Sequence, residues 1–329
     1  MINNKNLTLE ETFTLAIQNH KKNEIDIAVS LYNKVLKINP NHLGSYFNLG
    51  IIFNDLGNYQ KAKNCYKKVI EIDPNLGDAY NNLGVISSEL GEDEAAIKYY
   101  EKANEINSNS LNTQKNIANF YISELKNFEK AISSSYKVLK IHHENSLFIN
   151  ERIPLYRLKH DVQQAKYLIS KNYKINGIDK FQDFGEKILS RKENKENENN
   201  FNKKILLDQD EIKILLPFYK ENIIYKTETI SESCINPNKN WLAIEDEYLN
   251  SSNQIMYIDD FLSDEAVKEL YKFCLVSKVW NKEYQNKYLG AFSDSGFISP
   301  IHLQIAIDLK KKLPKLFGPH KLIKCWGFK

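Results

Sequence analysis

The stretches Tyr46-Phe-Asn-Leu-Gly50 and Tyr80-Asn-Asn-Leu-Gly84 decide the fold, because they carry the same pattern at an interval of 34 residues. Outward from them, small residues and tyrosines recur in the same phase: Ala28, Ala62 and Ala96, each followed four residues later by Tyr32, Tyr66 or Tyr100. Self-similarity at a fixed period of this length is typical of proteins built by stacking copies of one unit. The sequence therefore predicts a repeat architecture.

Each recurring residue type has a physical reason for its place. Small alanines and glycines let two helices approach closely, and the tyrosine fills the space beside them. Gly57 and Gly91 stand midway through their repeats, where a helical hairpin turns. Pro40 and Pro74 end the second helix, because proline lacks the backbone N–H and clashes with the preceding turn. One hairpin cannot bury its apolar face alone, so successive hairpins are expected to stack into a solenoid.

This pattern resembles the tetratricopeptide (TPR) repeat, with tyrosine in place of tryptophan at the first aromatic position. Ala131 follows Ala96 after 35 residues and Ala165 follows after 34 more, so the resemblance extends to four or five units. The last two units are degenerate: Ile117-Ala118 replaces Leu-Gly, and Pro154 falls inside the expected first helix of the fifth. We expect an α-helical TPR solenoid over residues 9–190, closed by a capping helix at about 178–191.

Asparagine precedes each Leu-Gly pair, and the same phase continues along the chain at Asn48, Asn82, Asn116 and Asn150, with Thr14 in the first unit. In TPR solenoids this position faces the concave groove. A carboxamide both donates and accepts hydrogen bonds, so it can pair with both groups of a peptide unit. The pattern resembles the TPR arm of O-GlcNAc transferase, whose groove holds substrate peptide through such an asparagine ladder.

That resemblance implies a peptide-binding site formed by these asparagines, with apolar side chains received by Phe47 and Ile51, and by Phe13 in the first unit. Asparagine is also common at this position in TPR proteins generally. The alternative interpretation is that the ladder only solvates the groove or bonds neighbouring helices.

Residues 191–203 are almost entirely charged or amide and carry a single apolar residue. Such a stretch cannot bury enough surface to offset its ordering entropy, so we expect a flexible linker. Apolar content returns after it, and all three tryptophans lie in this part: Trp241, Trp280 and Trp326. The shift predicts a second, smaller α+β segment over residues 204–329.

Within that segment, residues 254–262 are expected to form a strand, and Ser263 to cap a helix with Val267, Leu270, Tyr271 and Cys274 at helical spacing. A second helix is expected from Pro300 to Leu313, ended by Pro314, and a last strand over 320–329. The phrases Tyr257-Ile-Asp-Asp-Phe-Leu-Ser-Asp-Glu265 and Tyr288-Leu-Gly-Ala-Phe-Ser-Asp-Ser-Gly296 resemble the entry region of prolyl 4-hydroxylase-like Fe(II)/2-oxoglutarate dioxygenases. The resemblance implies the incomplete start of a double-stranded β-helix domain.

The iron ligands of that family have no match here. None of the seven histidines forms an H-x-D motif, and His142-His143-Glu144 with His160 is better explained as a solvated helix terminus. His302 is expected on a helix and His320 at the start of a strand. We therefore expect no catalytic residue, no metal site and no cofactor in this chain. Fe(II) and 2-oxoglutarate are implied only for a full-length parent.

Composition limits the remaining functions. Lys and Arg number 45 against 42 Asp and Glu, and a net charge of +3 is too balanced for a general nucleic-acid binder. No apolar run reaches 18 residues, so no membrane span is expected. Four well-separated cysteines indicate free thiols and a cytoplasmic protein.

The sequence thus predicts a protein-binding TPR module that captures an extended peptide, attached to a truncated oxygenase-like region. The alternative is a fragment of a TPR-recruited Fe(II)/2-oxoglutarate-dependent hydroxylase that is active only at full length. On either interpretation, residues 204–329 are expected to be poorly stable alone, because a sheet cut at its first strands leaves an unpaired edge.

Overall fold

The computed structural model describes residues 7–124, 127–146, 152–193, 204–221, 223–251, 258–280, 282–283, 289–320, 322 and 326–328. Contacts within the chain divide it into two compact units, Met1–Asn116 and Ile117–Lys329. We call them unit 1 and unit 2 and describe each by itself.

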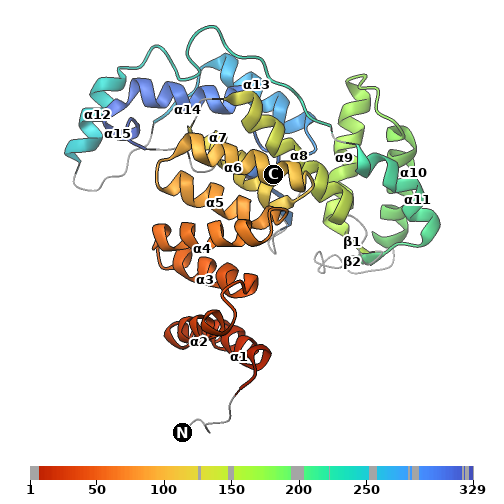
Figure 1. The fold of residues 1–329 in the computed structure, drawn as a ribbon. Coiled ribbons are helices and arrows are strands. Elements are labelled where there is room, and N and C mark those ends of the chain that lie inside the picture. Colours follow the sequence, from red (N-terminus) through yellow and green to blue (C-terminus); the bar gives the residue numbers. More distant parts are fainter. Residues whose placement is uncertain are drawn as a thin grey trace. The chain divides into compact units, whose positions relative to one another are not determined.

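Unit 1 is a stack of helical hairpins, which confirms the predicted TPR solenoid for this part of the chain (Figure 1). Each hairpin pairs a first helix with a second, and the next first helix packs on that pair. The first residues of α7 (Leu111–Glu124) complete the unit. The three hairpins are α1 (Leu9–Lys21) with α2 (Ile25–Ile38), α3 (Leu43–Asp55) with α4 (Tyr59–Ile72), and α5 (Gly77–Glu89) with α6 (Asp93–Ile106).

The repeated small residues and tyrosines form the core of these hairpins, as predicted. A Cβ on Gly50 would come within 2.7 Å of the Tyr66 ring, and one on Gly84 within 2.6 Å of the Tyr100 ring. Both tyrosines are buried, as are the alanines Ala28, Ala62 and Ala96. Close approach of two helices over a glycine thus explains why glycine and tyrosine recur together.

Hairpin turns and helix ends also follow the predicted pattern. Gly57 and Gly91 have φ of 70° and 73°, in the left-handed region that glycine adopts without a steric penalty. α2 ends at Ile38 and α4 at Ile72, two residues before Pro40 and Pro74. Proline therefore stands just past both of these helices, where it cannot disturb the hydrogen-bond ladder.

Unit 2 is also mainly helical, with two small antiparallel sheets. One sheet pairs β1 (Arg152–Pro154) with β2 (Lys204–Leu206), and the other has the order β3 (Lys282–Glu283), β4 (Leu289–Phe292), β5 (Trp326–Phe328). A 3-10 turn, η1 (Ser293–Ser295), follows β4. The helices beyond α7 are α8 (Phe128–Ser146), α9 (Leu155–Ser170), α10 (Ile178–Glu193), α11 (Gln209–Lys220), α12 (Trp241–Asn250), α13 (Asp264–Val276), α14 (Pro300–Lys312) and α15 (Pro314–Phe317).

The fifth repeat departs from the predicted phase. Pro154 lies in β1 immediately before α9, and not inside a helix. Ala165 is buried on α9, the first helix of this pair, whereas the 34-residue phase assigned it to the second. The expected capping helix is α10, but it is not the end of the stack, because the Phe181 and Phe218 rings pack face to face at 4.0 Å between α10 and α11.

Residues on both sides of the expected linker share one core. β2 pairs with β1, and Ile205 and Phe218 are buried in the same cluster as Ile153, Leu158 and Phe181. The units therefore do not coincide with the expected segments 9–190, 191–203 and 204–329. Residues 191–193 end α10, and the rest of the expected linker lies outside the described residues. As boundaries of independently folding domains, those segments stay a prediction.

Both helices expected in the second half are present. Ser263 caps α13, accepting a hydrogen bond from the Ala266 backbone N–H, and α14 begins at Pro300. Val267 is 51% and Tyr271 66% exposed on α13, whereas Ala266, Phe273 and Val276 are buried. Apolar residues lie on two faces of this helix, so their spacing indicated the helix but not its buried side.

Of the two strands expected in the second half, the described residues contain part of the second. Residues 258–262 contain no strand, and Leu262 forms only an isolated bridge with Ile235. β5 covers Trp326–Phe328, and His320 precedes it outside any strand. Residues 254–257 and Tyr288 lie outside the described part of the chain. The small two- and three-stranded sheets of the described residues do not support the expected start of an oxygenase barrel.

Candidate functional site

Three of the four predicted ladder asparagines lie at equivalent places in the structure. Asn48 is on α3, Asn82 on α5 and Asn116 on α7, and all three are half-buried. Asn150 lies outside the described residues. The 34-residue phase therefore places one carboxamide on each of three successive first helices.

Hydrogen bonds within the protein engage each of these carboxamides. The Asn48 Nδ2 donates to the Gly44 backbone oxygen at 2.8 Å, one turn earlier on α3. The Asn116 Nδ2 donates to Asn81 Oδ1 at 3.1 Å, which joins α7 to α5. Asn82 Oδ1 accepts from the neighbouring Asn81 Nδ2, also on α5, at 3.4 Å. Of these contacts, that of Asn116 joins two helices, as in the alternative interpretation, whereas Asn48 and Asn82 bond residues of their own helices. All three half-buried side chains keep part of their surface exposed.

The predicted apolar residues lie beside the ladder and partly inside the core. The Phe47 ring meets the Tyr66 ring edge-on, with 5.6 Å between centroids, and Ile51 packs against the same buried cluster. Phe13 packs in the same manner on His42, at 4.5 Å. Phe47, Ile51 and Phe13 are half-buried, so each serves the core while keeping part of its surface exposed.

One residue of this surface was missed by the sequence analysis. Asn81 is only 6% exposed, and it accepts from Asn116 and donates to Asn82 Oδ1 at 3.4 Å. The consecutive asparagines Asn81 and Asn82 were visible in the sequence, but only Asn82 was in phase with the ladder. A carboxamide at the preceding position was the signal that could have identified it.

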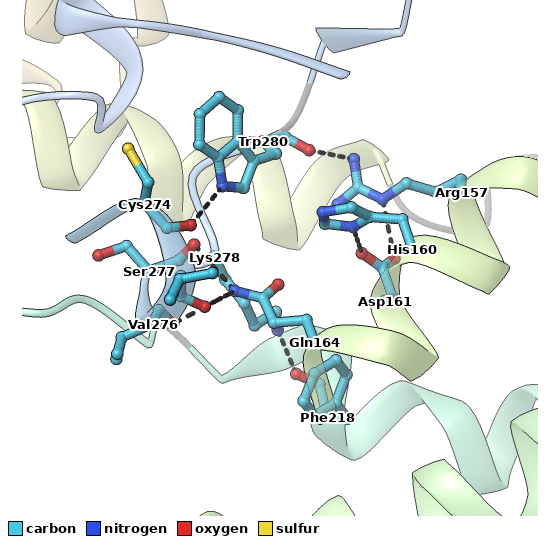
Figure 2. Close-up of polar contacts among 11 residues, drawn as sticks. Arg157, His160, Asp161, Gln164, Phe218, Cys274, Val276, Ser277, Lys278 and Trp280 are labelled. Atoms are coloured by element: carbon cyan, nitrogen blue, oxygen red, sulfur yellow. Dashed lines mark hydrogen bonds and ion pairs between the residues drawn. The ribbon is translucent and has the colours of Figure 1, made fainter. Parts of the chain in front are cut away.

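Unit 2 contains a buried group of polar side chains that the sequence did not predict (Figure 2). We call Arg157, His160, Asp161, Gln164 and Lys278 the α9 polar cluster, because all but Lys278 lie on α9. Arg157 Nε donates to Asp161 Oδ2 at 2.8 Å, and the His160 ring nitrogen Nδ1 lies 3.0 Å from Asp161 Oδ1. Asp161 thus holds two neighbouring side chains in place.

Gln164 and Lys278 bind the carbonyl ends of two helices. Gln164 Nε2 lies 3.0–3.3 Å from the backbone oxygens of residues 275, 276 and 277, at the end of α13. Lys278 Nζ donates to the backbone oxygens of Phe218 and Glu221, at the end of α11. The last carbonyls of a helix have no partner within it, so these side chains complete their hydrogen bonding.

Burial and neighbouring charges shift the pKa values of Asp161 and Lys278 in this cluster. Burial alone would raise the pKa of Asp161, but the Arg157 guanidinium and His160 hold it well below its usual range. Burial lowers the pKa of Lys278 to about 7. The side chain lies over the Phe218 ring, with Nζ 4.2 Å from the centroid. Gln164 fastens the end of α13 to α9, and Lys278 joins the segment after α13 to the end of α11, so the cluster has a structural role.

The described residues contain no group of three His, Cys, Asp or Glu side chains arranged to bind a metal ion. His302 is buried on α14, and the side chains of His142 and His143 lie outside the description. Cys65, Cys234 and Cys274 are free thiols, while Cys325 lies outside the described residues. None of the described helices combines the length and the apolar character needed to cross a bilayer.

Comparison with solved structures found similar proteins of low sequence identity. MamA from Desulfovibrio magneticus RS-1 is 19% identical over 43% of this chain and 78% of its own, with a TM-score of 0.40. YrrB, described as a TPR protein with an unusual peptide-binding site, is 17% identical over 51% and 79%, with a TM-score of 0.37. A mutant O-GlcNAc transferase from Thermobaculum terrenum is 18% identical over 43% and 27%, with a TM-score of 0.38.

A comparison with curated proteins found no match. Two family models, each described as tetratricopeptide repeat, match residues 45–76 and 65–98. Those residues span α3 to α6, the two hairpins in which glycine and tyrosine pack most closely. TPR repeats are therefore present in this part of the chain.

Proposed function

We propose that the chain is a protein-binding module and that unit 1 binds an extended peptide across its first helices. The observation that carries the proposal is the placement of Asn48, Asn82 and Asn116 on α3, α5 and α7, each half-exposed and one repeat apart. TPR repeats over residues 45–98 support it, because stacked hairpins of this kind form an extended surface suited to a linear partner.

The carboxamides keep hydrogen-bonding capacity for a ligand. Asn48 and Asn116 each donate through Nδ2, and no donor in the described part of the chain reaches either Oδ1 atom. Each amide also has two N–H groups, of which one is used in the bonds above. A backbone peptide unit of a ligand would present both an N–H and a C=O to such a group. Phe47 and Ile51 would receive its apolar side chains.

Peptide display on the immobilised full chain tests this function. Peptides selected on wild type are measured for affinity on wild type and on the triple variant Asn48→Ala/Asn82→Ala/Asn116→Ala, which is expected to bind at least about tenfold more weakly (~1.4 kcal/mol). The matched control is Asn33→Ala/Asn64→Ala, which removes two exposed asparagines from α2 and α4. Equal affinity of all three proteins would contradict a role for the ladder.

We place the protein in the cytoplasm and expect a protein or peptide partner, with no cofactor and no nucleic acid. The second candidate function is a TPR-recruited Fe(II)/2-oxoglutarate-dependent hydroxylase, of which this chain would be part. It is supported by the sequence resemblance of residues 204–329 alone. Calorimetric titration of the full chain with Fe(II) and 2-oxoglutarate under anaerobic conditions tests it, and absence of stoichiometric binding would remove it for this chain.

A further inference from the structure

Three asparagine side chains of unit 1 form a continuous row of hydrogen bonds that joins α7 to α5. Asn116 Nδ2 on α7 donates to Asn81 Oδ1 on α5, at 3.1 Å. Asn81 Nδ2 donates to Asn82 Oδ1, at 3.4 Å. The row thus runs from the half-buried Asn116 through the buried Asn81 to the half-buried Asn82.

Asn81 is what makes the row continuous, and its neighbours in the repeat cannot replace it. The positions 34 residues before and after Asn81 hold Phe47 and Lys115. A phenyl ring has no acceptor for a carboxamide, and a lysine ammonium only donates. Asn48 accordingly bonds its own turn at Gly44, with no described bridge to Asn82. The three ladder positions therefore divide into an isolated amide at Asn48 and a coupled pair, Asn82 and Asn116.

The row fixes which end of each carboxamide faces outward. A carboxamide can turn by half a rotation about its last bond and exchange its donor and acceptor. Here the Asn116 Nδ2 is held by Asn81, so Oδ1 is left as the acceptor. Donation along a row of hydrogen bonds polarises each member, which strengthens the acceptor at its open end. Asn82 accepts from Asn81 through Oδ1, so this oxygen has less capacity for a ligand.

We propose that Asn81 is a positioning residue of the peptide site: it orients Asn116 to accept an N–H from the bound main chain. This inference rests on the function proposed above and narrows its ligand. At α7 the site binds main chain through Asn116. At α3, where Phe47 stands in place of Asn81, it binds an apolar side chain. The partner is an extended segment with an apolar residue at one end and unpaired backbone N–H groups at the other.

The orientation is tested first without any ligand. Asparagine-selective 15N labelling of the full chain gives the side-chain NH2 resonances of Asn48, Asn82 and Asn116, assigned by single substitutions. Asn81→Leu is expected to shift the resonances of Asn116 and Asn82 and speed their exchange with water, while those of Asn48 stay in place. The control Asn64→Leu makes the same change at an exposed site on α4 and should move none of the three. Unchanged Asn116 resonances in Asn81→Leu would overturn the proposal.

Binding is tested next with the peptides obtained by display on wild type. Asn81→Leu and Asn116→Ala are each expected to weaken binding about tenfold, and the double variant no further, because Asn81 acts through Asn116. Asn81→Asp keeps an oxygen that accepts from Asn116, so this variant should retain most of the wild-type affinity that Asn81→Leu loses. Additive losses, or tenfold weakening by Asn116→Ala with wild-type binding by Asn81→Leu, would refute the positioning role and leave peptide binding standing. If display yields no peptide, the proposed function fails, and the resonances still decide whether Asn81 orients Asn116.

Discussion

The ring of Tyr66 on α4 lies directly over Gly50 on α3, so that a Cβ on Gly50 would come within 2.7–2.9 Å of three ring carbons. Separations this short are not found for real Cβ atoms, and Tyr66 is too deeply buried to move aside. The same relationship joins Gly84 and Tyr100 one repeat later. The spacing of the two helices in each hairpin is therefore set by the absence of a side chain on the first and the size of the aromatic ring on the second.

Gly50→Ala is accordingly expected to lower the free energy of unfolding of unit 1 by about 1–3 kcal/mol, because overpacking outweighs the better helix propensity of alanine. Chemical denaturation followed by circular dichroism measures the change. Gly77→Ala is the matched control: its nearest neighbour would lie at 3.4 Å, an ordinary contact. That variant should be neutral or slightly stabilising. Equal destabilisation by both substitutions would show that helix spacing is not the cause.

The sequence predicted unit 1 well because its information is local and repeated. Glycine, alanine, tyrosine and proline each recur at a position where one backbone or packing requirement selects them, so the 34-residue phase placed every hairpin and the three described ladder asparagines. Their hydrogen bonds could not be predicted in the same way. Whether Asn116 meets solvent or Asn81 depends on the distance between α5 and α7, which no periodicity encodes.

Unit 2 was harder to predict because its core is built from contacts between distant parts of the chain. Leu139 on α8 packs with Trp280 and Phe297, and Gln164 binds the end of α13 more than a hundred residues later. The linker composition predicted a change in character between the two halves but could not show that residues on both sides of it share a core. The oxygenase resemblance rested on short phrases, and residues 258–262, the described part of the strand expected at 254–262, form no strand.

The contact between Gln164 and α13 predicts a large effect of a conservative change. Gln164→Leu keeps the volume but leaves the backbone oxygens of residues 275–277 without their donor in a buried place. We expect a loss of about 1–3 kcal/mol in the free energy of unfolding of unit 2. Hydrogen exchange should rise most around the end of α13. Gln182→Leu, on the half-exposed face of α10, serves as the control and should change stability little.

The burial of Lys278 predicts that the free energy of unfolding depends on pH above pH 7. Its pKa is lowered by burial from an ordinary 10.5 to about 7, so between these values the unfolded chain holds a proton that the folded chain has released. Stability should therefore rise with pH from 7 to 10.5, by at most about 1.4 kcal/mol per pH unit from this residue. Lys278→Met should remove that contribution and, at pH 7, destabilise unit 2 by leaving the Phe218 and Glu221 oxygens unpaired. The wild type and variant are compared by urea unfolding at each pH. Parallel pH profiles would contradict a titrating Lys278.

The burial of His302 predicts that the free energy of unfolding also depends on pH on the acidic side. Its ring is buried on α14 between Phe273 and Phe297, with Nδ1 2.8 Å from Ser299 Oγ, and burial lowers its pKa from 6.5 to about 4. Between pH 6.5 and 4 the unfolded chain binds a proton that the folded chain does not accept. Stability should therefore be unaffected by this residue above pH 6.5 and fall as the pH drops towards 4, by up to about 1.4 kcal/mol per pH unit.

His302→Gln removes the titrating group. The difference in free energy of unfolding between wild type and this variant, measured by urea unfolding, should therefore narrow between pH 6.5 and 4. His160 belongs to the α9 polar cluster, where it contacts Asp161. His160→Gln therefore serves as the control, because it makes the same substitution at a histidine outside the His302 site. A constant difference between wild type and His302→Gln from pH 7 to pH 4 would mean that His302 is protonated in the folded chain as readily as in the unfolded one, and that burial does not govern its pKa.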